Sequence, residues 1–182
     1  LTEHKWICNV SCMNHNGPSA TFIDENTVVF RDNNNGFSQF IILDLKSGSE
    51  LYRITAKESH CAENGIYPFS LSKEFIGKNP DYPEISEPGI YTLNIKSGEI
   101  KFVVSEDEIV KVVENANLTP TENVAKVSHV QLNPSATSVM MRLGVPECPI
   151  FGALCCIDLD THKGHIIPDK PVHQLWYDDE TY

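Results

Sequence analysis

Apolar residues in this chain fall into short runs of about five to eight, rich in β-branched and aromatic side chains and bounded by Gly, Pro, Asn and Ser. This pattern predicts strands joined by turns. One phrase recurs three times, at residues 41–48, 90–98 and 153–164: an apolar run, then Asp or Asn, then a polar turn with Gly. Each copy predicts a β-hairpin, because Gly48 and Gly98 stand where a tight reversal favours a residue with positive φ.

A second pair of strands precedes the hairpin in the first and third copies. Residues 20–23 and 27–30 are apolar runs separated by a short polar turn, and residues 129–132 and 138–141 repeat that arrangement. Four consecutive antiparallel strands make one blade of a β-propeller. The repetition therefore predicts an all-β fold that is part of a β-propeller, with about three four-stranded antiparallel blades.

Insertions account for the uneven spacing of the copies. Leu45, Ile95 and Leu159 are equivalent positions, so successive repeats are 50 and 64 residues apart, against roughly 40 to 50 in common propeller repeats. One insertion, residues 75–88, holds three prolines and predicts an extended loop, since proline removes ladder donors. In the other, residues 106–127, the pattern fits a short helix or another strand.

The repeats divide a single partial propeller domain, residues 1–182, into blades. We expect blades at residues 15–57, 58–115 and 124–169, and the start of a further blade at 170–182. Three blades and a start cannot close a ring, and open sheet edges promote aggregation. We therefore expect this to be a fragment, with the remaining blades of the same protein completing a ring of about six or seven.

Composition narrows the range of partners. The chain carries 14 basic and 25 acidic residues, a net charge of −11, which argues against nucleic acid or an anionic membrane as a partner. No apolar run approaches the ~18 residues of a membrane span. Of the six cysteines, adjacent Cys155 and Cys156 should point to opposite faces of a strand, and the spacing of the others fits no metal site. Reduced thiols are the expectation, which favours a cytoplasmic protein.

Two histidines occupy equivalent positions one repeat apart. His129 opens one predicted first strand and His173 opens the next, 44 residues later. The first strands of neighbouring blades gather around the central channel of a propeller, so we expect the two side chains to converge on a site there. His60 has no repeat partner that the sequence identifies.

The strands that carry these histidines resemble those of a known family. The run His-Val-Gln-Leu-Asn-Pro at residues 129–134 and the run His-Gln-Leu-Trp-Tyr-Asp-Asp at residues 173–179 resemble strands of the oligogalacturonate lyases, seven-bladed propellers with TolB-like (WD40-like) relatives. The resemblance is strongest over residues 125–182. The chain also resembles uncharacterised bacterial propellers that share both histidine strands.

The resemblance implies a lyase of carbohydrate metabolism that cleaves short acidic oligosaccharides by β-elimination. A manganese ion, Mn²⁺, held by ligands that would lie after Tyr182, would neutralise the substrate carboxylate and stabilise the enediolate. The resemblance further implies that His173 contacts the substrate and that Arg142 is the catalytic base. The channel would be lined by His129, Gln131, Gln174 and Trp176.

Other functions fit the same residues. Only three arginines occur in the chain, which is few for an enzyme that binds a polyanion. His129 also fits a hydrogen bond to a neighbouring blade, and Trp176 also fits the core between blades. One alternative to a lyase is therefore a non-catalytic platform that binds a protein or carbohydrate partner. Another is the propeller part of a prolyl-oligopeptidase-like hydrolase.

Overall fold

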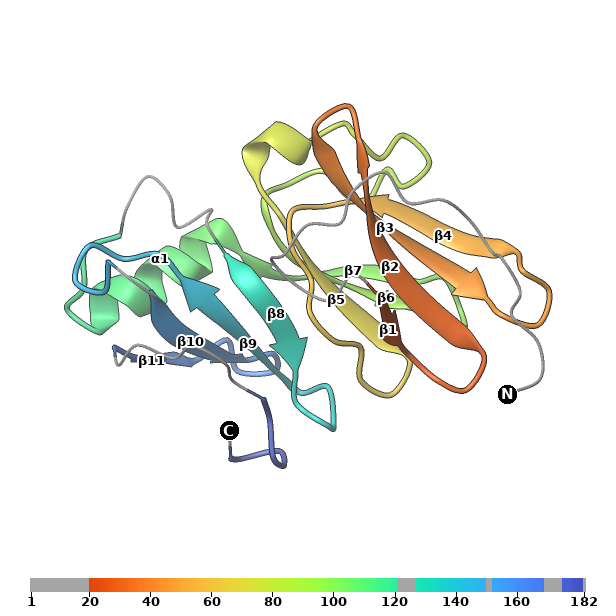
Figure 1. The fold of residues 1–182 in the computed structure, drawn as a ribbon. Helices are drawn as coiled ribbons and strands as arrows, with labels where there is room; N and C mark the ends of the chain where they lie inside the picture. Colours follow the sequence, from red (N-terminus) through yellow and green to blue (C-terminus); the bar gives the residue numbers. More distant parts are fainter. Residues whose placement is uncertain (1–19, 121–126, 150–151, 169–174, 182) are drawn as a thin grey trace.

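The computed structural model describes residues 20–120, 127–149, 152–168 and 175–181 (Figure 1). These residues form three antiparallel sheets in which the strands follow one another in sequence order. The first sheet consists of β1 (Ala20–Phe22), β2 (Thr27–Asn34), β3 (Phe37–Asp44) and β4 (Glu50–Thr55). The second consists of β5 (Ile66–Leu71), β6 (Gly89–Asn94) and β7 (Ile100–Ser105). The third consists of β8 (Ser128–Leu132), β9 (Ser138–Leu143), β10 (Ala153–Asp158) and β11 (Gly164–Ile167).

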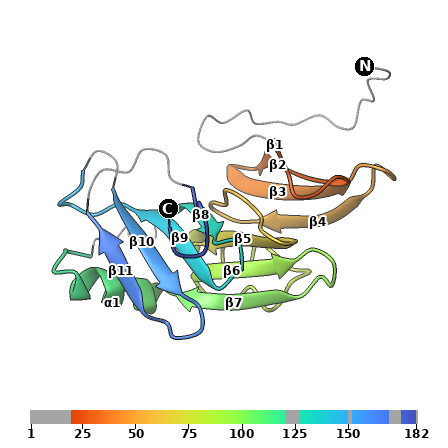
Figure 2. The same ribbon diagram turned by 90° about the horizontal axis from the view of Figure 1, so that it is seen from below.

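Each sheet is an up-and-down meander, which is the architecture of a propeller blade. The predicted all-β fold is confirmed, and so are both predicted strand pairs, β1 with β2 and β8 with β9. Figure 2 shows the first sheet stacked over the second, with the third beside them. The chain is therefore a succession of β-propeller blades.

The repeated turn owes its shape to the Asp or Asn that begins it. Asp44 Oδ1 accepts hydrogen bonds from the backbone N–H groups of Lys46 and Ser47, both at 2.8 Å. Asn94 accepts the equivalent pair in the second sheet, and Asp158 accepts one of them in the third. The residue four positions later has a positive φ in all three turns: Gly48 (70°), Gly98 (75°) and His162 (55°). The predicted glycines are confirmed in the first two turns, and a histidine takes that place in the third.

The second sheet is the least regular of the three. Where its first strand would lie, Glu58 makes a single antiparallel bridge with Ser70 of β5. Pro68 ends the ladder at this point, because it has no N–H and its carbonyl oxygen accepts a hydrogen bond from the Ser59 hydroxyl. The second sheet therefore has three full strands, with the bridge of Glu58 in place of a first strand.

The second insertion, for which the sequence leaves helix and strand open, begins with a helix. The helix α1 (Glu106–Asn115) follows β7 directly. A capping box starts it, since the Ser105 hydroxyl accepts from the Glu108 N–H at 3.2 Å and the Glu108 carboxylate accepts from the Ser105 N–H at 2.7 Å. No helix in the described part of the chain is long and apolar enough to cross a membrane.

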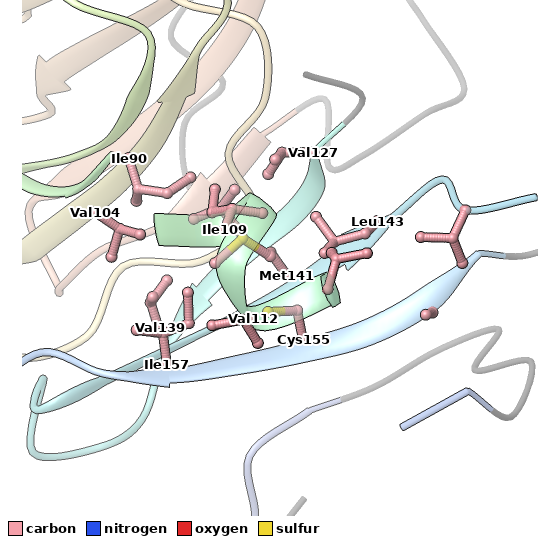
Figure 3. Close-up of a cluster of buried hydrophobic side chains, with 14 of the residues drawn as sticks. Ile90, Val104, Ile109, Val112, Val127, Val139, Met141, Leu143, Cys155 and Ile157 are labelled. Atoms are coloured by element: carbon pink, nitrogen blue, oxygen red, sulfur yellow. The ribbon is translucent and has the colours of Figure 1, made fainter. Parts of the chain in front are cut away.

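One hydrophobic core joins the second and third sheets through α1. Figure 3 shows Ile109 of α1 among side chains of both sheets, including Ile90 and Val104 from the second and Val139 and Met141 from the third. All five side chains are buried. Packing of this kind, at roughly 1.5–3 kcal/mol for each large apolar side chain, fixes the two blades relative to each other.

The predicted proline-rich loop is confirmed. Residues 72–88 connect β5 to β6 and begin with the short 3₁₀ helix η1 (Lys73–Phe75). The loop reaches the outer strand of the first sheet, where the Asn79 side chain pairs with the backbone of Thr55. The insertion of one blade therefore protects the edge of its neighbour.

Candidate functional site

The segments that begin the second and third sheets meet at two histidines. The rings of His60 and His129 stack, with centroids 5.4 Å apart and planes inclined by 24°. The His60 backbone N–H donates a hydrogen bond to the Val130 carbonyl oxygen at 3.0 Å. These two side chains, called the histidine pair below, therefore join consecutive blades at the edge where each meander starts.

A β-bulge presents His129 at this junction. The pairing of β8 with β9 shifts register between Ser128 and Gln131, and His129 has a φ of 55°. Histidine is one of the residues enriched in this left-handed region, but such a backbone still costs about 1–3 kcal/mol. Bulges re-aim side chains and recur beside functional sites. The bulge makes His129 a stronger candidate than its sequence position alone.

Cys61 lies beside the histidine pair. Its sulfur is 2.8 Å from Nδ1 of His60. Burial and, to a smaller extent, the charge of Glu63 raise the pKa of the Cys61 thiol to about 11. The thiol therefore stays protonated at neutral pH, which makes it a poor nucleophile.

A buried ion pair lies on the first-sheet side of the same junction. Arg31 Nη2 is 3.3 Å from Glu58 Oε1, and the two side chains are 10% and 14% exposed. Desolvation raises the pKa of Glu58, and the positive charge of Arg31 opposes that rise. A cavity of about 10 Å³, lined in part by Arg31, Ser59 and His60, has space for about one water molecule. Because of this ion pair, the charge of Arg31 is already neutralised by Glu58.

Three of the residues predicted from the sequence lie toward the other face of the third sheet. Gln131 is paired with Met140, whose side chain belongs to a buried cluster shared with β10. Arg142 lies two residues after Met140 and so shares its face, and burial lowers the pKa of its guanidinium. Trp176 packs against the same cluster. The structure thus groups these three residues, whereas His129 lies at the junction with the second sheet.

The remaining predicted residues, His173 and Gln174, lie outside the described residues. In the part of the chain that the structure describes, no three His, Cys, Asp or Glu side chains gather as a metal site requires. The described cysteines are free thiols. As predicted, Cys155 and Cys156 belong to the cores on opposite faces of the third sheet. The expected Mn²⁺ ligands, placed after Tyr182, stay a prediction.

Sequence reasoning missed His60 as the partner of His129. Its own segment, residues 57–60, contains charged and polar residues and no apolar run, so it predicts no strand. Insertions also displace it from the spacing that relates His129 to His173. The signal that could have found it is its place at the start of the blade, one short turn before β5.

No family model matches the chain, and no curated protein matches it. Solved structures similar to it include TolB from Acinetobacter baumannii, at 11% identity and a TM-score of 0.47 over 79% of this chain and 30% of that one. They include an acylaminoacyl peptidase in complex with Z-Gly-Gly-Phe-chloromethyl ketone, at 12% and 0.44 over 80% and 24%. They also include the β-propeller domain of the Trilobed protease from Pyrococcus furiosus, at 10% and 0.43 over 84% and 42%.

The chain thus spans less than half the length of each of these three structures. The likeness concerns the fold, which the sheet order and the repeated turns of the chain define on their own. The finer resemblance to oligogalacturonate lyases remains a prediction.

Proposed function

We propose that this chain is the ligand-binding section of a non-catalytic propeller platform, and that its ligand is a short acidic oligosaccharide held at the histidine pair. The observation that carries the proposal is the stack of His60 on His129 across two blades. Histidine ordinarily titrates near neutral pH, and a bound carboxylate favours the protonated imidazole. With Arg31 neutralised by Glu58, a protonated imidazole of the histidine pair would supply the positive charge for an anion.

This proposal predicts binding that strengthens as the pH falls through the histidine range. The test is calorimetric titration of the full-length protein with digalacturonate at pH 6 and pH 8. We expect affinity to be higher at pH 6, and to fall by about tenfold, which is ~1.4 kcal/mol, in His60→Gln and in His129→Asn. Asparagine is chosen at position 129 because it tolerates the left-handed backbone.

His165→Gln is the matched control, because His165 is an exposed histidine of β11 in the third sheet. Its affinity should equal that of the parent protein. Equal binding by all three variants, or binding that ignores pH, would contradict the proposal.

A lyase acting on the same class of ligand is the second candidate. Its support is the group that Gln131, Arg142 and Trp176 form toward the Met140 face of the third sheet. In this reading Arg142 removes the proton, His173 contacts the substrate, and the remaining blades of the protein supply the ligands for Mn²⁺. Ultraviolet absorbance of an unsaturated uronate, followed with Mn²⁺ and digalacturonate, separates the two candidates: product that disappears in Arg142→Lys supports the lyase, and binding without product supports the platform.

The peptidase-like alternative depends on a hydrolase domain elsewhere in the full-length protein. A fluorophosphonate probe would label such a domain covalently at its nucleophilic serine. Labelling would favour a hydrolase over both other candidates.

A further inference from the structure

A second site lies away from the histidine pair, between the outer strand of the first sheet and the proline-rich loop of the second. It is a cleft of about 430 Å³, lined by residues of β3, β4 and the segment 78–82 and by Asn34 at the end of β2. That volume lies within the range of small-molecule sites, roughly 300–1,000 Å³. The cleft therefore has room for a ligand of a few sugar or amino-acid units.

One wall of the cleft is a fixed polar network. Arg53 donates to both carboxylate oxygens of Glu50, at 2.9 and 2.5 Å, and to Gln39 Oε1 at 3.0 Å. Gln39 in turn donates to the Thr55 hydroxyl at 3.1 Å and is buried. A guanidinium group that is held on two sides loses little conformational entropy when a ligand binds. This wall is therefore set before binding.

The opposite wall is tied to the first. Asn79 accepts from the Thr55 N–H at 2.7 Å and donates to the Thr55 carbonyl oxygen at 2.8 Å, as a neighbouring strand would. Tyr52, which also lines the cleft, donates its hydroxyl proton to the Ile95 carbonyl oxygen of the next blade at 2.9 Å. These bonds hold two blades and one loop around a single hollow, so the cleft is a built feature and not a gap between loops.

The lining is polar, aromatic and electrically balanced. Two acidic residues, Glu50 and Asp81, and two basic residues, Arg53 and Lys78, line the cleft. The Lys78 ammonium also lies over the Phe37 ring, 4.5 Å from its centroid. An anion or a cation would find no net opposite charge here, whereas a ligand with many hydroxyl groups would meet both donors and acceptors.

We propose that this cleft binds a neutral oligosaccharide. Tyr52 and Tyr82 contribute aromatic surface for the C–H faces of a sugar, and the paired side chains of Glu50 and Arg53 present fixed acceptors and donors to its hydroxyls. The site is separate from the histidine pair in position and in the charge of the ligand that it selects. The proposal for this cleft can therefore succeed or fail independently of the platform proposal.

The test uses full-length protein labelled with ¹³C on its tyrosine rings, of which this chain contributes six. Maltotriose, cellotriose and chitotriose are the neutral probes, and trigalacturonate and the peptide Gly-Asp-Lys are the charged ones. We expect at least one neutral trisaccharide to shift the ring signals of Tyr52 and Tyr82, which tyrosine-to-phenylalanine variants assign. No shift with any neutral sugar, or larger shifts with either charged probe, would overturn the proposal.

A matched pair of double variants tests the lining. Lys78 and Asp81 are exposed, so removing both with K78A/D81A should weaken sugar binding about tenfold without unfolding the protein. The control is E99A/K101A, which removes another exposed pair of opposite charges, 3.4 Å apart, on the second sheet. Equal affinity in both double variants would also overturn the proposal, and digalacturonate binding at the histidine pair should be unchanged in each.

Discussion

The turns that join the last two strands are alike in all three blades, whereas the segments that begin the blades differ from one another. The three turns share an Asp or Asn acceptor and a residue of positive φ at the same position. The three beginnings differ: β1 has three residues, the second sheet has a single bridge, and β8 carries a bulge. The repeated part is scaffold, and the varied part is where the histidine pair lies.

The largest effect should come from the scaffold core. Met141 is fully buried between the second and third sheets, so Met141→Ala should lower the free energy of unfolding by about 2–5 kcal/mol. Urea unfolding, followed by far-ultraviolet circular dichroism, measures the loss. Phe22→Ala is the control, because Phe22 is 70% exposed and its loss should cost less than about 0.5 kcal/mol. A cost below about 1 kcal/mol for Met141→Ala would mean that the blades do not share this core.

The next largest loss of stability should come from replacing a glycine in one of the turns. Gly98 has a φ of 75°, and an added Cβ would lie 3.2 Å from the Tyr52 hydroxyl. Gly98→Ala should therefore destabilise the protein by about 1–2 kcal/mol. His162 holds the equivalent position without a glycine, so His162→Ala should cost clearly less. Equal losses would show that the third turn depends on its His162–Glu108 contact at 2.7 Å rather than on backbone conformation.

The turns and the beginnings also differ in how well the sequence predicts them. A turn depends on residues within five positions of one another, so Asp44 and Gly48 reveal it directly. The reduced first strand of the second sheet depends on Pro68, which lies in the facing strand and ends the ladder from there. The stack of His60 on His129 joins residues from two blades, and no local pattern in the segment 57–60 predicts it. Sequence therefore predicts the scaffold well and the candidate site only through the one histidine that begins a recognisable strand.

Relieving the strained histidine should separate stability from binding. His129→Gly removes the cost of a φ of 55°, and we expect the free energy of unfolding to stay the same or rise by up to about 1 kcal/mol. The same variant removes one ring of the histidine pair, so digalacturonate binding should fall as in His129→Asn. Thermal unfolding and calorimetry on one preparation give both values. A clear loss of stability would show that the stack of His129 on His60 contributes to the stability of the fold and is not mainly a ligand-binding feature.

The smallest effect is a dependence on pH that one turn has and its counterpart lacks. The N–H of Ser47 is the main cause that lowers the pKa of Asp44. A carboxyl with a lowered pKa stabilises the fold above its unfolded value of about 3.9, and that contribution is lost as the pH falls through the folded pKa. Asn94 makes the same turn without a charge. Asp44→Asn should therefore flatten the acid limb of the unfolding midpoint against pH, and Asn94→Asp should steepen it, while both leave the midpoint at pH 7 nearly unchanged. The two variants exchange an oxygen and a nitrogen atom at equivalent positions. Changes of opposite sign in the slope of the acid limb would show that the turns are interchangeable. Changes of the same sign would show that each blade has adapted its turn to its own surroundings.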